Sequence, residues 1–186
     1  MDILLDDQEV QIREAASEFL AGECTSALVR KIETDPLQYS PALWEKFAEN
    51  GWLQLCLSDK NGGQELPLTY LALLFELAGY HIAPIPLHAT MVPAMIIDRH
   101  GNAQQQQLLQ QVLSGDLILS HAVAEANGRW TPESIKLEGR VEGDQLVLNG
   151  TKTFVGSYRA SKQCLVVYRE ATAPHHLGVV LVPTDA

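Results

Sequence analysis

Three short stretches of the chain carry residue types that could do chemistry. Ser120-His121 places a hydroxyl beside an imidazole, but adjacent strand residues point to opposite faces and cannot form the hydrogen bond that a nucleophile needs. His175-His176 offers two imidazoles, yet neighbouring rings in extended chain do not aim at one metal ion, so a solvated turn is expected. Gly150-Thr151-Lys152-Thr153 is similar to the end of a phosphate-binding loop, but Gln145 stands where that loop begins with glycine, and a hairpin is expected there. None of these stretches alone predicts a site.

Composition and charge exclude several classes of function. The 186 residues are 46% hydrophobic and 19% charged, which is typical of an ordinary globular protein. A net charge of −10 disfavours binding to nucleic acid or to anionic lipid. The longest apolar run, residues 70–75, is too short to span a membrane, and the N-terminus has no secretory signal pattern. The chain has an odd number of widely spaced cysteines: Cys24, Cys56 and Cys164. This pattern predicts reduced thiols, a cytoplasmic location and no metal centre.

The elements that must position any site change character near Gly115. Before it, apolar residues recur at helical spacing, and helices are expected from Asp6 (a capping box with Glu9), from Ser40 to Gly51, and over 67–78, 86–100 and 103–113. Gly79 is expected to stop the third of these helices.

After Gly115 the pattern is that of strands, expected over 117–124, 145–149, 152–155, 163–169 and 177–183, with a hairpin at residues 142–144. The prediction is an α+β chain, with an N-terminal helical bundle over 1–115 and an antiparallel, barrel-like β domain over 116–186. An unpaired edge is expected where this sheet stops.

Several segments in order resemble acyl-CoA dehydrogenases. The frame His121-Ala122-Val123-Ala124-Glu125 falls on that family's aromatic-x-hydrophobic-Thr-Glu, and residues 149–157 (NGTKTFVGS) fall on its Asn-Gly-x-Lys-x-Trp-Ile-Thr-Asn. Residues 43–53, Asn61-Gly62-Gly63 and residues 113–117 follow the same family, so the resemblance covers essentially the whole chain. It implies that the family's C-terminal helical domain is absent here.

The resemblance implies a reaction that this chain cannot complete alone. The family removes the α-proton of an acyl-CoA with a carboxylate base and passes a β-hydride to FAD, and the base belongs to the C-terminal helical domain. Glu125 falls on a glutamate that is structural in the family, so no catalytic residue is expected within these 186 residues.

The implied FAD contacts are Val123, Ala124, Trp130, Phe154, Val155 and Gly156. Four of them lack the family's usual side chain: Ala124 and Gly156 replace threonines, Trp130 a serine and Phe154 a tryptophan, while Asn127-Gly128-Arg129 replaces a Gly-x-Gly. Trp130 either occludes the flavin cleft or is a surface aromatic. Phe154 is expected in the β core rather than as a flavin platform.

Two functions remain open. The first is an FAD-dependent acyl-CoA dehydrogenase fragment or subunit, inactive alone, that forms a homo- or hetero-oligomer with an acyl-CoA dehydrogenase subunit that supplies the flavin site and the base. Some bacterial members that act on bulky CoA thioesters pair a competent with a degenerate subunit. The second is a non-enzymatic assembly module that keeps the fold without flavin.

Overall fold

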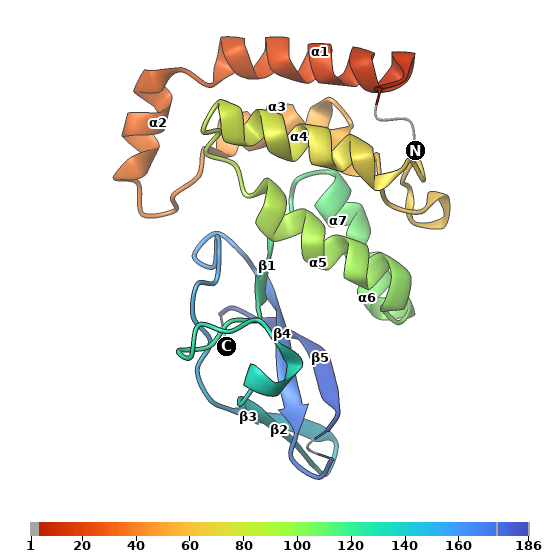
Figure 1. Cartoon of the computed structure of the whole chain (residues 1–186), viewed down its shortest axis with the longest axis vertical. Coiled ribbons are helices and arrows are strands. Elements are labelled where there is room, and N and C mark those ends of the chain that lie inside the picture. Colours follow the sequence, from red (N-terminus) through yellow and green to blue (C-terminus); the bar gives the residue numbers. More distant parts are fainter. Residues whose placement is uncertain (1–3, 174, 186) are drawn as a thin grey trace.

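The computed structural model describes residues 4–173 and 175–185 and contains two layers, one helical and one a β-sheet (Figure 1). The helices come first: α1 Asp7–Glu23, α2 Ser26–Glu33, α3 Pro41–Glu49, α4 Leu68–Tyr80, α5 Leu87–His100, α6 Ala103–Gln107 and α7 Leu109–Leu113. Short 3₁₀ turns lie at Trp52–Gln54, Asp59–Asn61 and Pro132–Ser134. The strands follow: β1 Leu119–Ala122, β2 Glu138–Glu142, β3 Gln145–Asn149, β4 Gln163–Glu170 and β5 Leu177–Pro183. The expected α+β class is confirmed.

The helix starts follow the local chemistry of the sequence. Asp6 accepts the backbone N–H of Glu9, and the Glu9 carboxylate accepts the N–H of Asp6, which completes the expected capping box. Ser40 caps α3 with Pro41 in its first turn.

The predicted stop at Gly79 is wrong, because α4 continues to Tyr80 and the left-handed residue after it is Ile82, with φ 51°. Helix α2 was not predicted, and the expected helix over 103–113 is divided into α6 and α7.

The sheet is mixed rather than purely antiparallel. Strand β4 pairs parallel with β1 in the register Leu119↔Gln163, and briefly parallel with β2 in the register Glu138↔Arg169. It pairs antiparallel with β5 along its length, while β2 and β3 form the expected hairpin. The expected strand over 152–155 is absent from the described residues, which have no regular structure there. The sheet therefore stays open.

Alternation along the strands gives the sheet two apolar faces. Leu119, Leu165 and Leu181 join the large helical core, and α5 packs on β1. Residues that alternate with these leucines along β1, β4 and β5 face the other way. They form a second, smaller cluster that includes Ala122, Cys164, Val166, Val180 and Val182. The strands thus present one side to the helices and the other to the loops that carry the candidate site.

The Asn61-Gly62-Gly63 turn fixes the helical layer. The Asn61 amide donates to the buried Asp98 carboxylate at 2.6 Å, and Gln110 donates to the Asn61 carbonyl at 2.9 Å. A Cβ on Gly63 would lie 2.0 Å from the Leu57 carbonyl oxygen, so only glycine fits. This part of the family pattern serves packing.

Candidate functional site

An ion pair joins the two segments that carry the expected flavin contacts. Lys152 Nζ lies 2.8 Å from Glu125 Oε1, and the two side chains are only 6% and 9% exposed. The same carboxylate accepts the backbone N–H groups of Lys136 and Leu137, each at 2.9 Å. Burial would raise the pKa of Glu125, but the hydrogen bonds from Lys152, Leu137 and Lys136 and the charge of Lys152 outweigh it and lower the pKa. Glu125 is thus a structural carboxylate whose oxygens are occupied, which makes it unsuitable as a base.

Backbone contacts hold the same segments side by side. The Thr153 N–H donates to the Ala124 carbonyl at 2.9 Å, and Lys152 Nζ also reaches the Val123 carbonyl at 3.1 Å. Ala124 is 2% exposed, and Val123 is partly exposed. The structure therefore brings the two expected contact segments together, although their role toward flavin stays a prediction.

Phe154 contradicts the expectation that it lies in the core. Its side chain is 87% exposed, and its backbone is left-handed with φ 54°. Because a left-handed residue breaks extended geometry, the chain turns here instead of continuing a strand, and the ring projects from the turn. Phe154 also lines a cavity of about 470 Å³ on the loop side of the sheet, together with Val155. The ring thus lies at the surface beside this cavity.

Gly156 leaves bare space at the end of that turn. It is exposed, and among the described residues an added Cβ would meet only Ala89 Cβ within 4 Å, at 3.9 Å. The loop thus reaches the first turn of α5. The space would admit the Cβ of a threonine, the residue that the resemblance implies here. Crowding therefore does not explain why this chain has glycine at this position.

Trp130 does not occlude this face. The indole is 67% exposed, in a loop closed by the Asn127 amide donating to the Ser134 carbonyl at 2.8 Å and by the Ser134 hydroxyl donating to the Arg129 carbonyl at 2.9 Å. The occlusion hypothesis is therefore wrong for this structure, and the alternative of a surface aromatic holds.

A histidine pair beside the loop was missed by sequence reasoning. His121 and His88 have ring centroids 5.4 Å apart, and His88 lies the same distance from Phe75. Pro93 within α5 has no N–H to give the Ala89 carbonyl four residues earlier, and His121 Nδ1 approaches that carbonyl at 3.5 Å. Burial and the charge of His88 lower the pKa of His121 more than the Ala89 carbonyl raises it. The sequence signal was the proline inside a helix.

The rejection of Ser120-His121 as a catalytic pair agrees with the structure. Ser120 is fully buried and accepts the Ser161 hydroxyl at 3.0 Å, whereas His121 faces α5. The two side chains lie on opposite faces of β1.

Comparison with known proteins decides the family. The sequence profile of the acyl-CoA dehydrogenase N-terminal domain matches residues 6–116. The chain belongs to the acyl-CoA dehydrogenase family. The long-chain specific acyl-CoA dehydrogenase of Rattus norvegicus mitochondria is 28% identical over 145 residues, which cover 75% of this chain and 34% of that protein. In the part of this chain that the structure describes, no helix is long and apolar enough to cross a membrane.

Two solved structures share the fold described above. A variant of the Tcur3481-Tcur3483 steroid ACAD superposes with a TM-score of 0.87 at 30% identity, covering 97% of this chain and 49% of that one. The ChsE4-ChsE5 complex from Mycobacterium tuberculosis gives 0.86 at 22% identity, covering 98% and 49%. The chain therefore spans about half the length of these solved relatives.

The residues present fit FAD in part. The exposed Phe154 ring and the open space at Gly156 leave a surface for a flat cofactor. The Thr153 hydroxyl beside them is buried, and no described residue bonds it. Ala124 offers a backbone N–H, while its carbonyl already accepts from Thr153. The chain can supply a stacking face and backbone groups, but not the usual hydroxyl donors.

Proposed function

We propose that this chain forms the N-terminal and middle parts of an FAD-dependent acyl-CoA dehydrogenase that desaturates a bulky acyl-CoA thioester. A further segment or a sister subunit supplies the base. The observation that carries the proposal is the buried Glu125–Lys152 pair, which joins the two family loops while leaving the Phe154 ring exposed.

Each group has a definite task in this proposal. Bound flavin would accept the hydride that leaves the β-carbon of the substrate. Phe154 stacks against the cofactor, the Gly156 and Ala124 backbones approach it, and Glu125 with Lys152 keeps the loops in register. None of the described residues that line the cavity beside Phe154 is a carboxylate, so proton removal is assigned to a further segment or a sister subunit. The steroid ACAD likeness at 30% identity supports a bulky acyl group.

The test compares the purified chain alone with the chain co-expressed with a candidate sister subunit of the acyl-CoA dehydrogenase family. Flavin absorbance and dye-coupled turnover of acyl-CoAs are measured for both. The chain alone should be colourless and inactive, and the complex yellow and active. Replacing the partner's catalytic glutamate by glutamine should abolish turnover and keep the colour. Turnover by the isolated chain would contradict the proposal.

The second candidate is an assembly module without flavin, favoured by the missing hydroxyls at Ala124 and Gly156. This candidate would be supported if the two proteins formed a stable complex while the partner alone carried as much flavin as the complex.

A further inference from the structure

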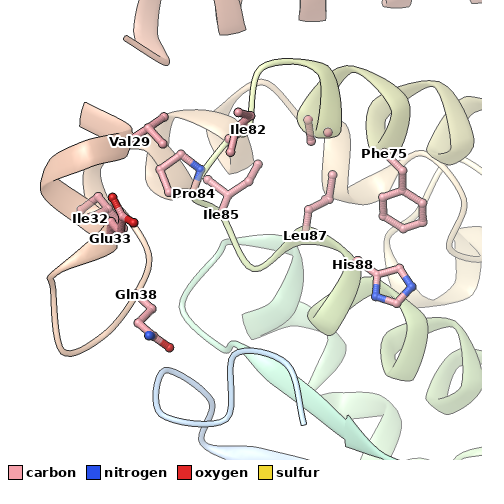
Figure 2. Close-up of a pocket in the computed structure, with 13 residues that line it drawn as sticks. Val29, Ile32, Glu33, Gln38, Phe75, Ile82, Pro84, Ile85, Leu87 and His88 are labelled. Carbon is pink, nitrogen blue, oxygen red and sulfur yellow. The ribbon is translucent and has the colours of Figure 1, made fainter. Parts of the chain in front are cut away.

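A broad groove lies between α2 and the connection from α4 to α5 (Figure 2). Its volume is about 870 Å³, near the upper end of small-molecule sites. Apolar side chains make most of its wall: Val29, Ile32, Phe75, Ile82, Ile85 and Leu87. One linear chain would leave much of so broad a wall without contacts, whereas a fused-ring group would cover it.

The wall of the groove is preformed. Pro84 and Pro86 restrict the backbone of the connection, and the Ser40 N–H donates to the Pro84 carbonyl at 2.8 Å. A second backbone bond, from the Ile85 N–H to the Ala83 carbonyl at 2.8 Å, closes the turn. A ligand would therefore bind without first ordering this segment.

His88 places a polar group in this apolar wall. Its ring is held between those of Phe75 and His121, each with a centroid distance of 5.4 Å. Neither ring nitrogen of His88 has a hydrogen-bond partner among the described residues, while His121 Nδ1 is directed to Ala89. Figure 2 shows His88 on the opposite side of the groove from Glu33 and Gln38. An imidazole can donate to a ligand oxygen or accept from a hydroxyl.

The groove adjoins the candidate flavin face. His88 is followed by Ala89, the residue that an added Cβ on Gly156 would meet at 3.9 Å. The distal part of a substrate bound at this face would have to pass along α5 to enter the groove.

We infer that His88 is a specificity-determining residue, which hydrogen-bonds a ring hydroxyl on a bulky, fused-ring acyl group lying in this groove. The inference rests on the proposed function for the identity of the ligand as substrate. The binding site itself can be tested without flavin or turnover, so the failure of one leaves the other to its own measurement.

The probes are lithocholic acid, cholanic acid, which lacks the ring hydroxyl, and palmitic acid, which is linear. Dissociation constants for the chain are measured by calorimetry. The parent should bind lithocholic acid about five- to tenfold more tightly than cholanic acid, as one neutral hydrogen bond allows, and palmitic acid most weakly. His88→Phe keeps the stacked ring, so it should remove the preference and leave cholanic acid binding unchanged.

A second pair of variants tests the location. Gly79 lines the groove within α4, and an added Cβ there would meet no described atom within 4 Å, so Gly79→Leu places a larger side chain at the groove. Gly22→Leu is the matched control, because Gly22 is also helical with open space around it but lies in α1, away from the groove. Gly79→Leu should weaken both ring acids at least about tenfold, and Gly22→Leu should not. No binding by the parent, a preference that survives His88→Phe, or equal effects of the two leucines would overturn the inference.

Discussion

In the helical half, Phe47 is wholly buried, with its ring 4.8 Å from that of Trp52 and 6.2 Å from that of Trp44. In the sheet half, Phe154 is 87% exposed on a left-handed turn, and Trp130 is 67% exposed on another loop. The aromatic rings that pack together in the helical half are thus buried, while Phe154 and Trp130 of the sheet half lie at the surface.

The two halves differ in which substitutions the fold can tolerate. A family fold depends on buried side chains in the first half and on a buried ion pair in the second. Ala124 and Gly156, where the resemblance implies threonines that contact flavin, belong to neither set, so the fold does not depend on hydroxyl groups at these two positions.

The largest loss is expected for Phe47→Ala. Removing a fully buried ring from the helical core should lower the free energy of unfolding by about 4 kcal/mol, through lost burial and the cavity left behind. Urea unfolding followed by tryptophan fluorescence and circular dichroism measures it. Phe47→Leu, which retains most of the volume, should recover more than half of the loss. Equal stability of Phe47→Ala and the parent would contradict the view of a closed core.

In the sheet half, Lys152→Met should cost about 3 kcal/mol, because it leaves the Glu125 carboxylate buried without its cation. The double variant Lys152→Met with Glu125→Gln should be less destabilised than the single variants predict by addition. Calorimetric melting of the four proteins gives the coupling. Lys46→Met, at a surface pair with Glu23, is the control and should change stability by less than about 1 kcal/mol.

Acid should weaken the same anchor. The pKa of Glu125 is lowered in the fold, so its stabilising contribution is full above the ordinary carboxyl pKa and is lost as pH falls through the folded value. Asp98 behaves alike, because hydrogen bonds from Ser58 and Asn61 overcome burial and lower its pKa too. Stability measured from pH 6 downward should therefore fall, and Glu125→Gln should make the fall shallower. An unchanged slope would show that the carboxylate is not the titrating anchor.

A smaller loss is expected where β4 meets β5. A Cβ on Gly178 would lie 2.2 Å from Cζ of Tyr168, and one on Gly139 would lie 2.2 Å from Cδ2 of the same ring. Gly178→Ala should cost about 2 kcal/mol through displacement of the ring. In a Tyr168→Ala background the same change should cost little, as urea titration can show. A similar cost in both backgrounds would exclude the ring as the cause.

The elements with local signals were predictable from sequence. Asp6 with Glu9 and Ser40 with Pro41 start helices because their caps involve residues three apart. Strand β5 also falls at the expected residues, 177–183. Parallel pairing of β4 with β1 joins segments about 40 residues apart and leaves no local signal, so the sheet type was misjudged.

The candidate site was predictable as a set of segments but not as a shape. The sequence of Asn149-Gly150 predicts a hairpin turn. In the structure, Lys152 instead forms an ion pair with Glu125, and the chain turns at Phe154. That outcome depends on a contact 27 residues away. The groove is built from α2, α4 and α5. The position of His88 in its wall depends on contacts with the rings of Phe75 and His121, which are distant in the sequence. Such sites arise from tertiary packing, which a linear pattern does not encode.

The smallest effect on stability, and the most informative, is expected for Phe154→Ala. Because the ring is 87% exposed, its removal should change the free energy of unfolding by less than about 0.5 kcal/mol. In the co-expressed complex it should nevertheless lower flavin retention, since the ring is proposed to stack on the cofactor. Tyr80→Ala, at an 81% exposed ring on the last residue of α4, is the matched control and should change neither quantity. Flavin absorbance after dialysis provides the measurement. If Phe154→Ala lost stability while keeping its flavin, the ring would serve the fold after all, and the contrast with Phe47 would disappear.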